Sequence, residues 1–447
     1  MRSKPAEPAA DAQDDSAASL LEHEDRNFLT LAAYMIAMRV GWIFKTESIV
    51  IPAFLDTISG AGWVRGFLPM FNRFGQSIPP ILFARRLKVM QRKKWALAGF
   101  SLAMGTVFLA LSAIWSLCHD TGGDWLPVIF LALYALFFAC TGLGQLANGT
   151  LQGKLVRTHR RGKLLMVSTT VGAALAMLAA WLVLGDWLAL EPPGFQYVFG
   201  FTGVLFVISA ILASRLSESA DHQTELPIVL RETVKNAARI FRDDRRFRRL
   251  ALVGVLFSSV LLLFPHYQAL ARTRMGMGLE QLVLWVVVQN AGTGLFSTIA
   301  GPLADRRGNR LVLRFVTFGS AATPVLAVVL ASSPADGRLW FWLVFVSIGL
   351  TPIMFKTMTN YTLEISTKED HPRYLSTLSL CIAAPFCFSP LVGWLIDTIG
   401  FEPVMLAGAG LIVLAGLLTF RLDEPRHEHH PETVEITMDN VDVGIDK

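Results

Sequence analysis

Long apolar runs recur along almost the whole chain and are separated by short polar stretches. A run of roughly 18 or more apolar residues is long enough to cross the hydrocarbon core of a bilayer as a helix. At roughly 30 residues for each span and its loop, the chain between its polar ends holds about twelve such helices. The pattern predicts spans at 28–56, 62–84, 95–117, 125–153, 164–186, 194–215, 250–271, 280–304, 311–332, 338–364, 374–398 and 401–421.

The polar stretches divide the chain into two equal sets of spans. We predict an all-α membrane protein with two pseudo-symmetric six-helix bundles. The predicted parts are an N-terminal tail (1–27), the first bundle (28–216), a linker (217–249), the second bundle (250–421) and an acidic C-terminal tail (422–447). Apolar residues at helical spacing in the linker predict either an amphipathic helix on the membrane surface or a solvated connector.

Composition agrees with a membrane protein, because 53% of residues are hydrophobic and only 17% are charged. Soluble domains carry about 25% charged residues. The formal net charge of +5 comes from Lys and Arg that collect in every second loop and in the linker. The positive-inside rule accounts for this bias, so we expect no nucleic-acid partner. It predicts that both termini are cytoplasmic and that the protein lies in the plasma membrane, the inner membrane in a Gram-negative cell.

An internal repeat supports the two-bundle arrangement. The segments 148–161 and 360–373 align without a gap and end spans four and ten, which correspond in a six-plus-six fold. The identical pairs are Asn148 and Asn360, Thr150 and Thr362, Leu151 and Leu363, His159 and His371, and Arg161 and Arg373. Parallel repeats of this kind place a substrate site near the midplane of the membrane, between the two halves.

The loop after span eight reads Gly301-Pro-Leu-Ala-Asp-Arg-Arg-Gly-Asn-Arg310. It resembles the signature of the major facilitator superfamily, in which a glycine and an aspartate precede basic residues around a second glycine. The resemblance implies a monomeric transporter with alternating access and gives this loop the role of a latch between the halves. The latch candidates are Gly301, Asp305, Arg306, Gly308 and Arg310. A charged loop that only sets membrane orientation is the simpler alternative. After span two, Arg85 stands where the aspartate would be, so that copy is degenerate.

Polar side chains inside the spans are costly, and each is therefore a functional candidate. The candidates for substrate binding or coupling are Arg39, Lys45, Glu47, Asn72, Arg73, Gln76, His266, Gln289, Asn290, Lys356 and Asn360. Bases outnumber acids among them, and Glu47 is the one acid. This excess favours an organic anion or a phosphorylated solute, because arginine binds carboxylate and phosphate with two parallel hydrogen bonds.

Deep charges of both signs suggest two ion pairs. Glu47 is expected to pair with Arg73 or with Arg39, which lies eight residues earlier on nearly the same helix face, whereas Lys45 points elsewhere. Lys356 is expected to pair with Glu364. Such pairs can also serve only to hold helices together. As the one intramembrane acid, Glu47 is the candidate for proton coupling.

The main interpretation is a secondary transporter of a small solute, with protons as a candidate coupling ion and the bilayer as its surroundings. The chain has no GxxxxGK[ST] loop for nucleotide, so transport would use a gradient, and we expect no cofactor. A drug or amphiphile exporter of the same fold, and a receptor or scaffold without transport, are the alternatives. We see no nucleophile–base pair or metal cluster, so an enzyme is not expected.

Overall fold

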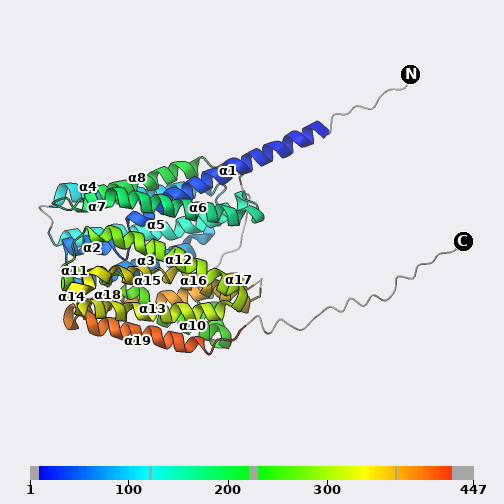
Figure 1. The fold of residues 1–447 in the computed structure, drawn as a ribbon. Helices are drawn as coiled ribbons and strands as arrows, with labels where there is room; N and C mark the ends of the chain where they lie inside the picture. Colours follow the sequence, from blue (N-terminus) through cyan, green and yellow to red (C-terminus); the bar gives the residue numbers. More distant parts are fainter. Residues whose placement is uncertain (1–9, 120–122, 221–229, 368–369, 425–447) are drawn as a thin grey trace, which may run out of the picture.

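The computed structural model describes residues 10–119, 123–220, 230–367 and 370–424. The predicted tails at 1–27 and 422–447 and the linker at 217–249 lie partly outside these ranges. Within the described residues the chain is helical and has no strand. The helices form two bundles that lie side by side (Figure 1).

The N-terminal bundle contains the first eight α-helices and a π-helical turn. They are α1 (Ala10–Phe44), α2 (Val50–Ile58), α3 (Gly62–Val89), α4 (Lys94–Cys118), α5 (Trp125–Leu155), α6 (Thr158–Ala179), η1 (Ala180–Leu184), α7 (Gly185–Leu188) and α8 (Phe195–Ser214). Its core is aromatic. The Phe54 ring lies 4.8 Å from Phe199 and 5.1 Å from Phe130, centroid to centroid.

The linker contains helix α9 (Leu230–Asp243), which packs against the C-terminal bundle. That bundle consists of α10 (Arg245–Phe257), α11 (Ser259–Met275), α12 (Gln281–Arg307), α13 (Asn309–Ser332), α14 (Pro334–Trp340), α15 (Trp342–Ile348), α16 (Thr351–Ile365), α17 (His371–Ala383), the 3-10 turn η2 (Ala384–Phe388), α18 (Ser389–Ile399) and α19 (Phe401–Thr419).

Eleven helical stretches of the described chain are long and apolar enough to cross a membrane. Helix α3 is also long enough, with 28 residues, but it carries Arg65, Asn72, Arg73 and Gln76, which lower its hydropathy. With α3 as the twelfth span, the predicted fold class of two six-helix bundles is confirmed.

The predicted first span at 28–56 is not one helix. It is divided into α1 and α2, with a non-helical break at residues 45–49. Pro52 explains the break, because its ring clashes with the carbonyl group four residues earlier and its nitrogen has no proton to donate. Two candidate residues, Lys45 and Glu47, lie inside this break.

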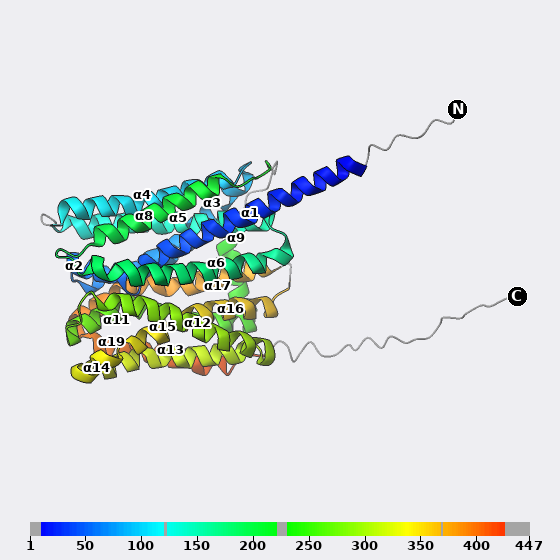
Figure 2. The same cartoon turned by 45° about the horizontal axis from the view of Figure 1, so that its top comes forward.

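Both the start of α1 and the end of α19 lie at one end of the paired bundles, which we call the terminal end (Figures 1 and 2). The opposite end, where α2 is joined to α3, is called the far end. Because α3, α5 and α12 finish at the terminal end, the basic loops that follow them lie there too.

At the far end the two halves meet through the backbones of α3 and α18. A Cβ atom added to Gly393 would lie 2.0 Å from the carbonyl oxygen of Gly62, and one added to Gly66 would lie 2.4 Å from that of Ser389. Small residues at such positions let two membrane helices approach closely. These glycines therefore allow the far end to close.

We expect Gly393→Ala to open the far end, because its methyl group cannot fit against Gly62. Spin labels on Ser59→Cys and Thr398→Cys, in a protein without its four native cysteines, measure the separation. The distance should lengthen in Gly393→Ala. Gly410→Ala is the matched control, since nothing lies within 4 Å of its added Cβ. An unchanged distance in Gly393→Ala would contradict the role given to this contact.

Candidate functional site

The break between α1 and α2 contains an ion pair of a fully buried lysine and a partly buried glutamate. The Lys45 Nζ atom is fully buried and lies 2.6 Å from Glu47 Oε1. The same Nζ lies 3.3 Å from the centre of the Trp42 ring, a cation–π contact. The expected pairing of Glu47 with Arg73 or Arg39 is not formed. Helical spacing does not apply across the break, so Lys45 and Glu47, only two residues apart, can meet.

A chain of amide side chains continues from this pair. The second Glu47 oxygen accepts a hydrogen bond from Asn72 Nδ2. Asn72 Oδ1 accepts from Gln76 Nε2 at 2.5 Å, and Gln76 Oε1 accepts from Gln145 Nε2 at 3.4 Å. The sequence predicted the polar face of α3 that carries Asn72 and Gln76. It did not single out Gln145, which adds a side chain of α5 to this series of hydrogen bonds.

Arg73 lies between the two halves. Its guanidinium carbon is 4.4 Å from the ring centre of Phe355 and 5.5 Å from that of Phe386, both in the C-terminal half. It forms no hydrogen bond or salt bridge with a described residue. Arg73 thus has no direct carboxylate partner among the described residues, and Glu47 acts on its charge through space. The two rings were not predicted, because only the fold brings them to α3.

Two cavities meet at Arg73. One, of about 40 Å³, is bounded by Glu47, Asn72, Arg73 and Phe386 among others. The other, of about 480 Å³, lies between α3 and α5 of the first half and α16 and α17 of the second. The larger cavity is lined by Gln76, Gln145 and Phe355, among others, and extends toward the terminal end.

Arg39 lines a third cavity of about 260 Å³ within the N-terminal half. Met35, Met38, Trp42 and Gln145 also line it, so it adjoins the larger cavity at Gln145. The Arg39 Nε atom is buried and has no hydrogen-bond partner among the described residues. Its guanidinium group forms no ion pair there either.

Three further candidates, His266, Gln289 and Asn290, lie on α11 and α12 of the C-terminal bundle. Gln289 accepts a hydrogen bond from Ser48 across the two halves at 2.7 Å, beside Glu47. Asn290 donates to the Val286 carbonyl of its own helix. His266 is fully buried and lines none of the three cavities. Of these three, Gln289 is therefore the candidate that contacts the segment carrying Glu47.

On α16, Lys356 and Asn360 are exposed. The expected ion pair of Lys356 with Glu364 is absent, and Lys356 forms no salt bridge with a described residue. Glu364 instead accepts a hydrogen bond from Asn309 Nδ2 at 2.9 Å. Lys356 and Glu364 lie eight residues apart on one helix, which is about two turns and too far for a direct contact. Asn309 lies closer to Glu364 and bonds to it instead.

Carboxylates from both halves close the far end. Asp397 of α18 accepts hydrogen bonds from the backbone N–H groups of Gly62 (2.9 Å) and Trp63 (3.2 Å), at the first turn of α3. A helix N-terminus favours a negative charge because its first N–H groups lack partners. Asp56 of α2 binds Arg65 and also accepts from Gln268 of α11 at 2.8 Å. Sequence reasoning missed Asp56 and Asp397, which lie at span ends.

Among the latch candidates, Arg310 is bound within its own half. Gly308 has φ +85°, a conformation that suits glycine, and divides α12 from α13. Arg310 donates to the Leu422 carbonyl and lies 3.5 Å from a Glu424 carboxylate oxygen. Gly301 has no atom within 4 Å of an added Cβ, so close helix approach does not explain this glycine. Asp305 and Arg306 are exposed. A latch across the halves stays a prediction.

The fold and the cavity between its halves define a membrane transporter. The family model of the Major Facilitator Superfamily matches residues 28–350 and 270–439. The chain belongs to this superfamily, and it is a transporter and not an enzyme.

Two curated relatives match part of the chain. It is 30% identical over 187 residues to the multidrug resistance protein MdtG of Dickeya zeae (strain Ech586), covering 40% of this chain and 44% of that protein. It is 28% identical over 225 residues to the cis,cis-muconate transport protein of Acinetobacter baylyi (strain ATCC 33305 / BD413 / ADP1), covering 47% and 52%. The match thus spans about half the length of these relatives.

The fold is also similar to that of a solved transporter. A mutant of the nucleoside transporter NupG superposes with a TM-score of 0.70 at 11% identity, covering 89% of this chain and all of that one. At this identity the likeness concerns the fold.

We expect Lys45→Met and Glu47→Gln to lower thermal stability singly and the double variant to recover part of it. Removing one partner of a buried ion pair costs about 3–5 kcal/mol, because the other charge stays buried, whereas removing both is far milder. Unfolding of the purified protein in detergent measures the three variants. If the two single losses of stability simply add in the double variant, the two side chains do not stabilise each other.

Proposed function

We propose that this transporter carries a small organic anion, which binds Arg73 and Arg39. The observation behind the proposal is that the one acid at the site, Glu47, is already paired with Lys45. Neither arginine has a carboxylate partner among the described residues. The cavities around Glu47 are therefore left with a net positive charge.

The chemistry of arginine narrows the substrate class. A guanidinium group is planar, keeps its charge and offers paired N–H donors that match a carboxylate or a phosphate. Arg73 lies where the two halves meet, the place at which transporters with parallel repeats bind their substrates. The Phe355 and Phe386 rings that flank Arg73 favour an organic anion over a bare inorganic one, because they offer apolar surface.

One of the relatives supports an organic anion. The Acinetobacter protein is named as a transporter of cis,cis-muconate, a carboxylate compound. The similarity covers 47% of the present chain, so this name supports the class of substrate and not the identity of the compound.

The positive-inside rule places the terminal end in the cytoplasm, since the basic loops lie there. The far end would then face outward, and in this structure it is closed by the contacts of Asp397 and Asp56. The cavity around Arg73 would be reached from the cytoplasm. Transport requires these far-end contacts to break while the terminal end closes, as in rocking of the two halves.

Coupling to protons would act through the Lys45–Glu47 pair. A proton on Glu47 removes its charge, so Lys45 and the arginines together attract an anion more strongly. By linkage, the anion then favours the protonated site to the same extent. A proton and an anion would thus be bound together. A proton on Glu47 would not act by releasing Arg73, because Arg73 forms no hydrogen bond or salt bridge with Glu47.

Export of amphiphiles is the second candidate. The cavity around Arg39 is lined by three methionines and Trp42, and methionine adapts to ligands of varied shape. The Dickeya relative is named as a multidrug resistance protein. The charge of Arg39 favours an acidic amphiphile even in this case.

We expect Arg73→Gln to lower uptake of dicarboxylates into proteoliposomes by roughly 10- to 100-fold, the cost of losing a hydrogen bond to a charged group. Cis,cis-muconate is the first compound to use. Arg92→Gln is the control, because this substitution removes the same charge from an exposed position. Uptake that is intact in Arg73→Gln, or lost equally in Arg92→Gln, would refute anion binding by Arg73.

We expect Glu47→Gln to remove the pH dependence of anion binding. In the wild type, affinity should rise as pH falls, because protonation of Glu47 adds positive charge to the site. Glutamine has no charge to lose, so the affinity of this variant should be constant. Binding of labelled anion is measured below the unfolding temperature of both proteins. A variant that keeps the wild-type pH profile would exclude Glu47 as the coupling group.

A further inference from the structure

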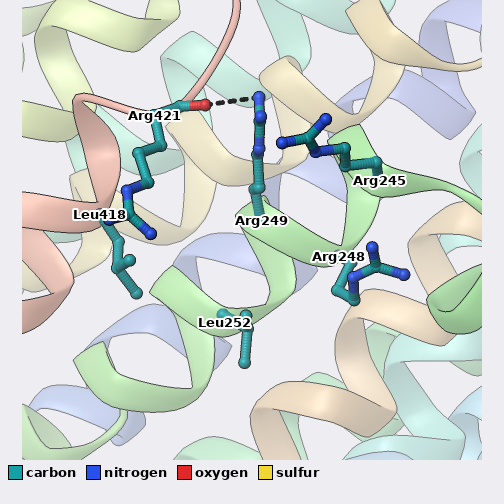
Figure 3. A pocket seen from close by; sticks show the side chains of 6 residues that line it. All are labelled: Arg245, Arg248, Arg249, Leu252, Leu418 and Arg421. Atoms are coloured by element: carbon teal, nitrogen blue, oxygen red, sulfur yellow. Dashed lines mark hydrogen bonds between the residues drawn. The ribbon is translucent and has the colours of Figure 1, made fainter.

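Away from the transport cavity, four arginines gather around a hollow at the terminal end of α10 and α19. The hollow has a volume of about 450 Å³ and is lined by Arg245, Arg248, Arg249, Leu252, Leu418 and Arg421 (Figure 3). Its polar lining is cationic, and its remaining lining is two leucines. This combination is not used by any step of transport described above.

Two of the arginines are fixed in place by the protein. Arg249 donates to the carbonyl oxygen of Arg421 at 2.8 Å and to Asp423 Oδ1 at 3.1 Å. Arg248 donates to the carbonyl oxygen of Arg242 at 2.6 Å. The first bond ties α10 to the end of α19, as the dashed line in Figure 3 shows. These contacts shape the hollow.

The other two arginines are free to bind a ligand. Arg245 and Arg421 are exposed and form no hydrogen bond through their side chains, and no salt bridge, with a described residue. Figure 3 shows the Arg245 guanidinium group directed toward Arg249, and that of Arg421 on the other side of the hollow. Asp423 is shared by Arg249 and Arg246, so it does not neutralise Arg245 or Arg421.

The apolar part of the hollow faces the surroundings of the bundle. Leu252 is 40% exposed, and Leu417 and Phe420, next to Leu418 and Arg421 on the same stretch, are more than half exposed. Side chains of this kind on a membrane-spanning helix contact lipid tails. The hollow therefore has a cationic rim at the end of the helices and an apolar floor along them.

We infer that this hollow binds the headgroup of an anionic phospholipid, with the phosphate between Arg245 and Arg421 and an acyl chain along Leu252 and Leu418. Basic pockets between membrane helices on the cytoplasmic side are suited to such headgroups. A soluble phosphate compound has the same charge but no acyl chain to pack against the leucines, so a lipid is favoured.

The test is the thermal stability of the full-length protein in neutral detergent during titration with phosphatidylglycerol. A ligand that binds the folded state raises its apparent stability by mass action. We expect stabilisation by phosphatidylglycerol and not by phosphatidylcholine. In Arg245→Gln/Arg421→Gln, half-saturation should need roughly 30-fold more lipid, since each lost cation weakens attraction to an anionic headgroup.

The matched control is Arg92→Gln/Arg215→Gln, which removes two exposed arginines that follow the ends of α3 and α8. It should bind phosphatidylglycerol like the wild type. If either double variant does not fold, its single variants replace it; each of the Arg245→Gln and Arg421→Gln proteins should need roughly fivefold more lipid.

Four results would overturn the inference. Equal weakening in both double variants would show only a general effect of surface charge. No weakening in Arg245→Gln/Arg421→Gln would show that these two arginines do not bind the headgroup. Equal stabilisation by phosphatidylcholine would remove the headgroup preference. Equal stabilisation by glycerol 3-phosphate at the same concentration would show a site for a soluble phosphate compound and not for a lipid.

Discussion

The buried pair of Lys45 and Glu47 is the interaction on which the account of the site depends. It forms because the first span is interrupted ahead of Pro52, so that two side chains only two residues apart can meet. Glu47 is bound directly by Lys45 and Asn72, so it acts on Arg73 only through space, and neither Arg73 nor Arg39 forms a salt bridge with a described residue. Interrupted helices at the midplane are a common device of transporters for presenting charge to a solute. Here the interruption would set the sign of the solute.

The same segment connects the site to the closure of the far end. Ser48, next to Glu47, bonds to Gln289 of the other half, and α2 carries Asp56, which bonds to Gln268. Movement of the halves that breaks these contacts would also alter the surroundings of Glu47. The far end itself is closed by direct backbone contact at Gly62 and Gly393 and by Asp397 at the start of α3. These are short-range contacts, so they can form and break as units.

Much of the fold could be predicted from the sequence, because the lengths of apolar runs and the spacing of basic loops depend on the bilayer alone. The break at 45–49 was missed, since the apolar residues on either side of the short polar stretch Lys45 to Ser48 were merged into one predicted span, which hid the effect of Pro52. The site was predicted in part. The polar face of α3 follows from its helical period, but the partner of Glu47 depended on the break. Contacts of Arg73 with Phe355, and of Asp397 with Gly62, join residues more than 280 positions apart and follow no local pattern.

The most direct test of the central claim, a cavity selective for negative charge, is ligand-induced thermal stabilisation of the wild-type protein. Dicarboxylates, their neutral diesters and diamides, and organic cations of similar size should be compared at one pH and one ionic strength. The account predicts that only the anions stabilise the protein and that the two charge-free derivatives do not. Stabilisation by the cations, or equally by the neutral derivatives, would mean that Arg73 and Arg39 do not set the charge of the substrate.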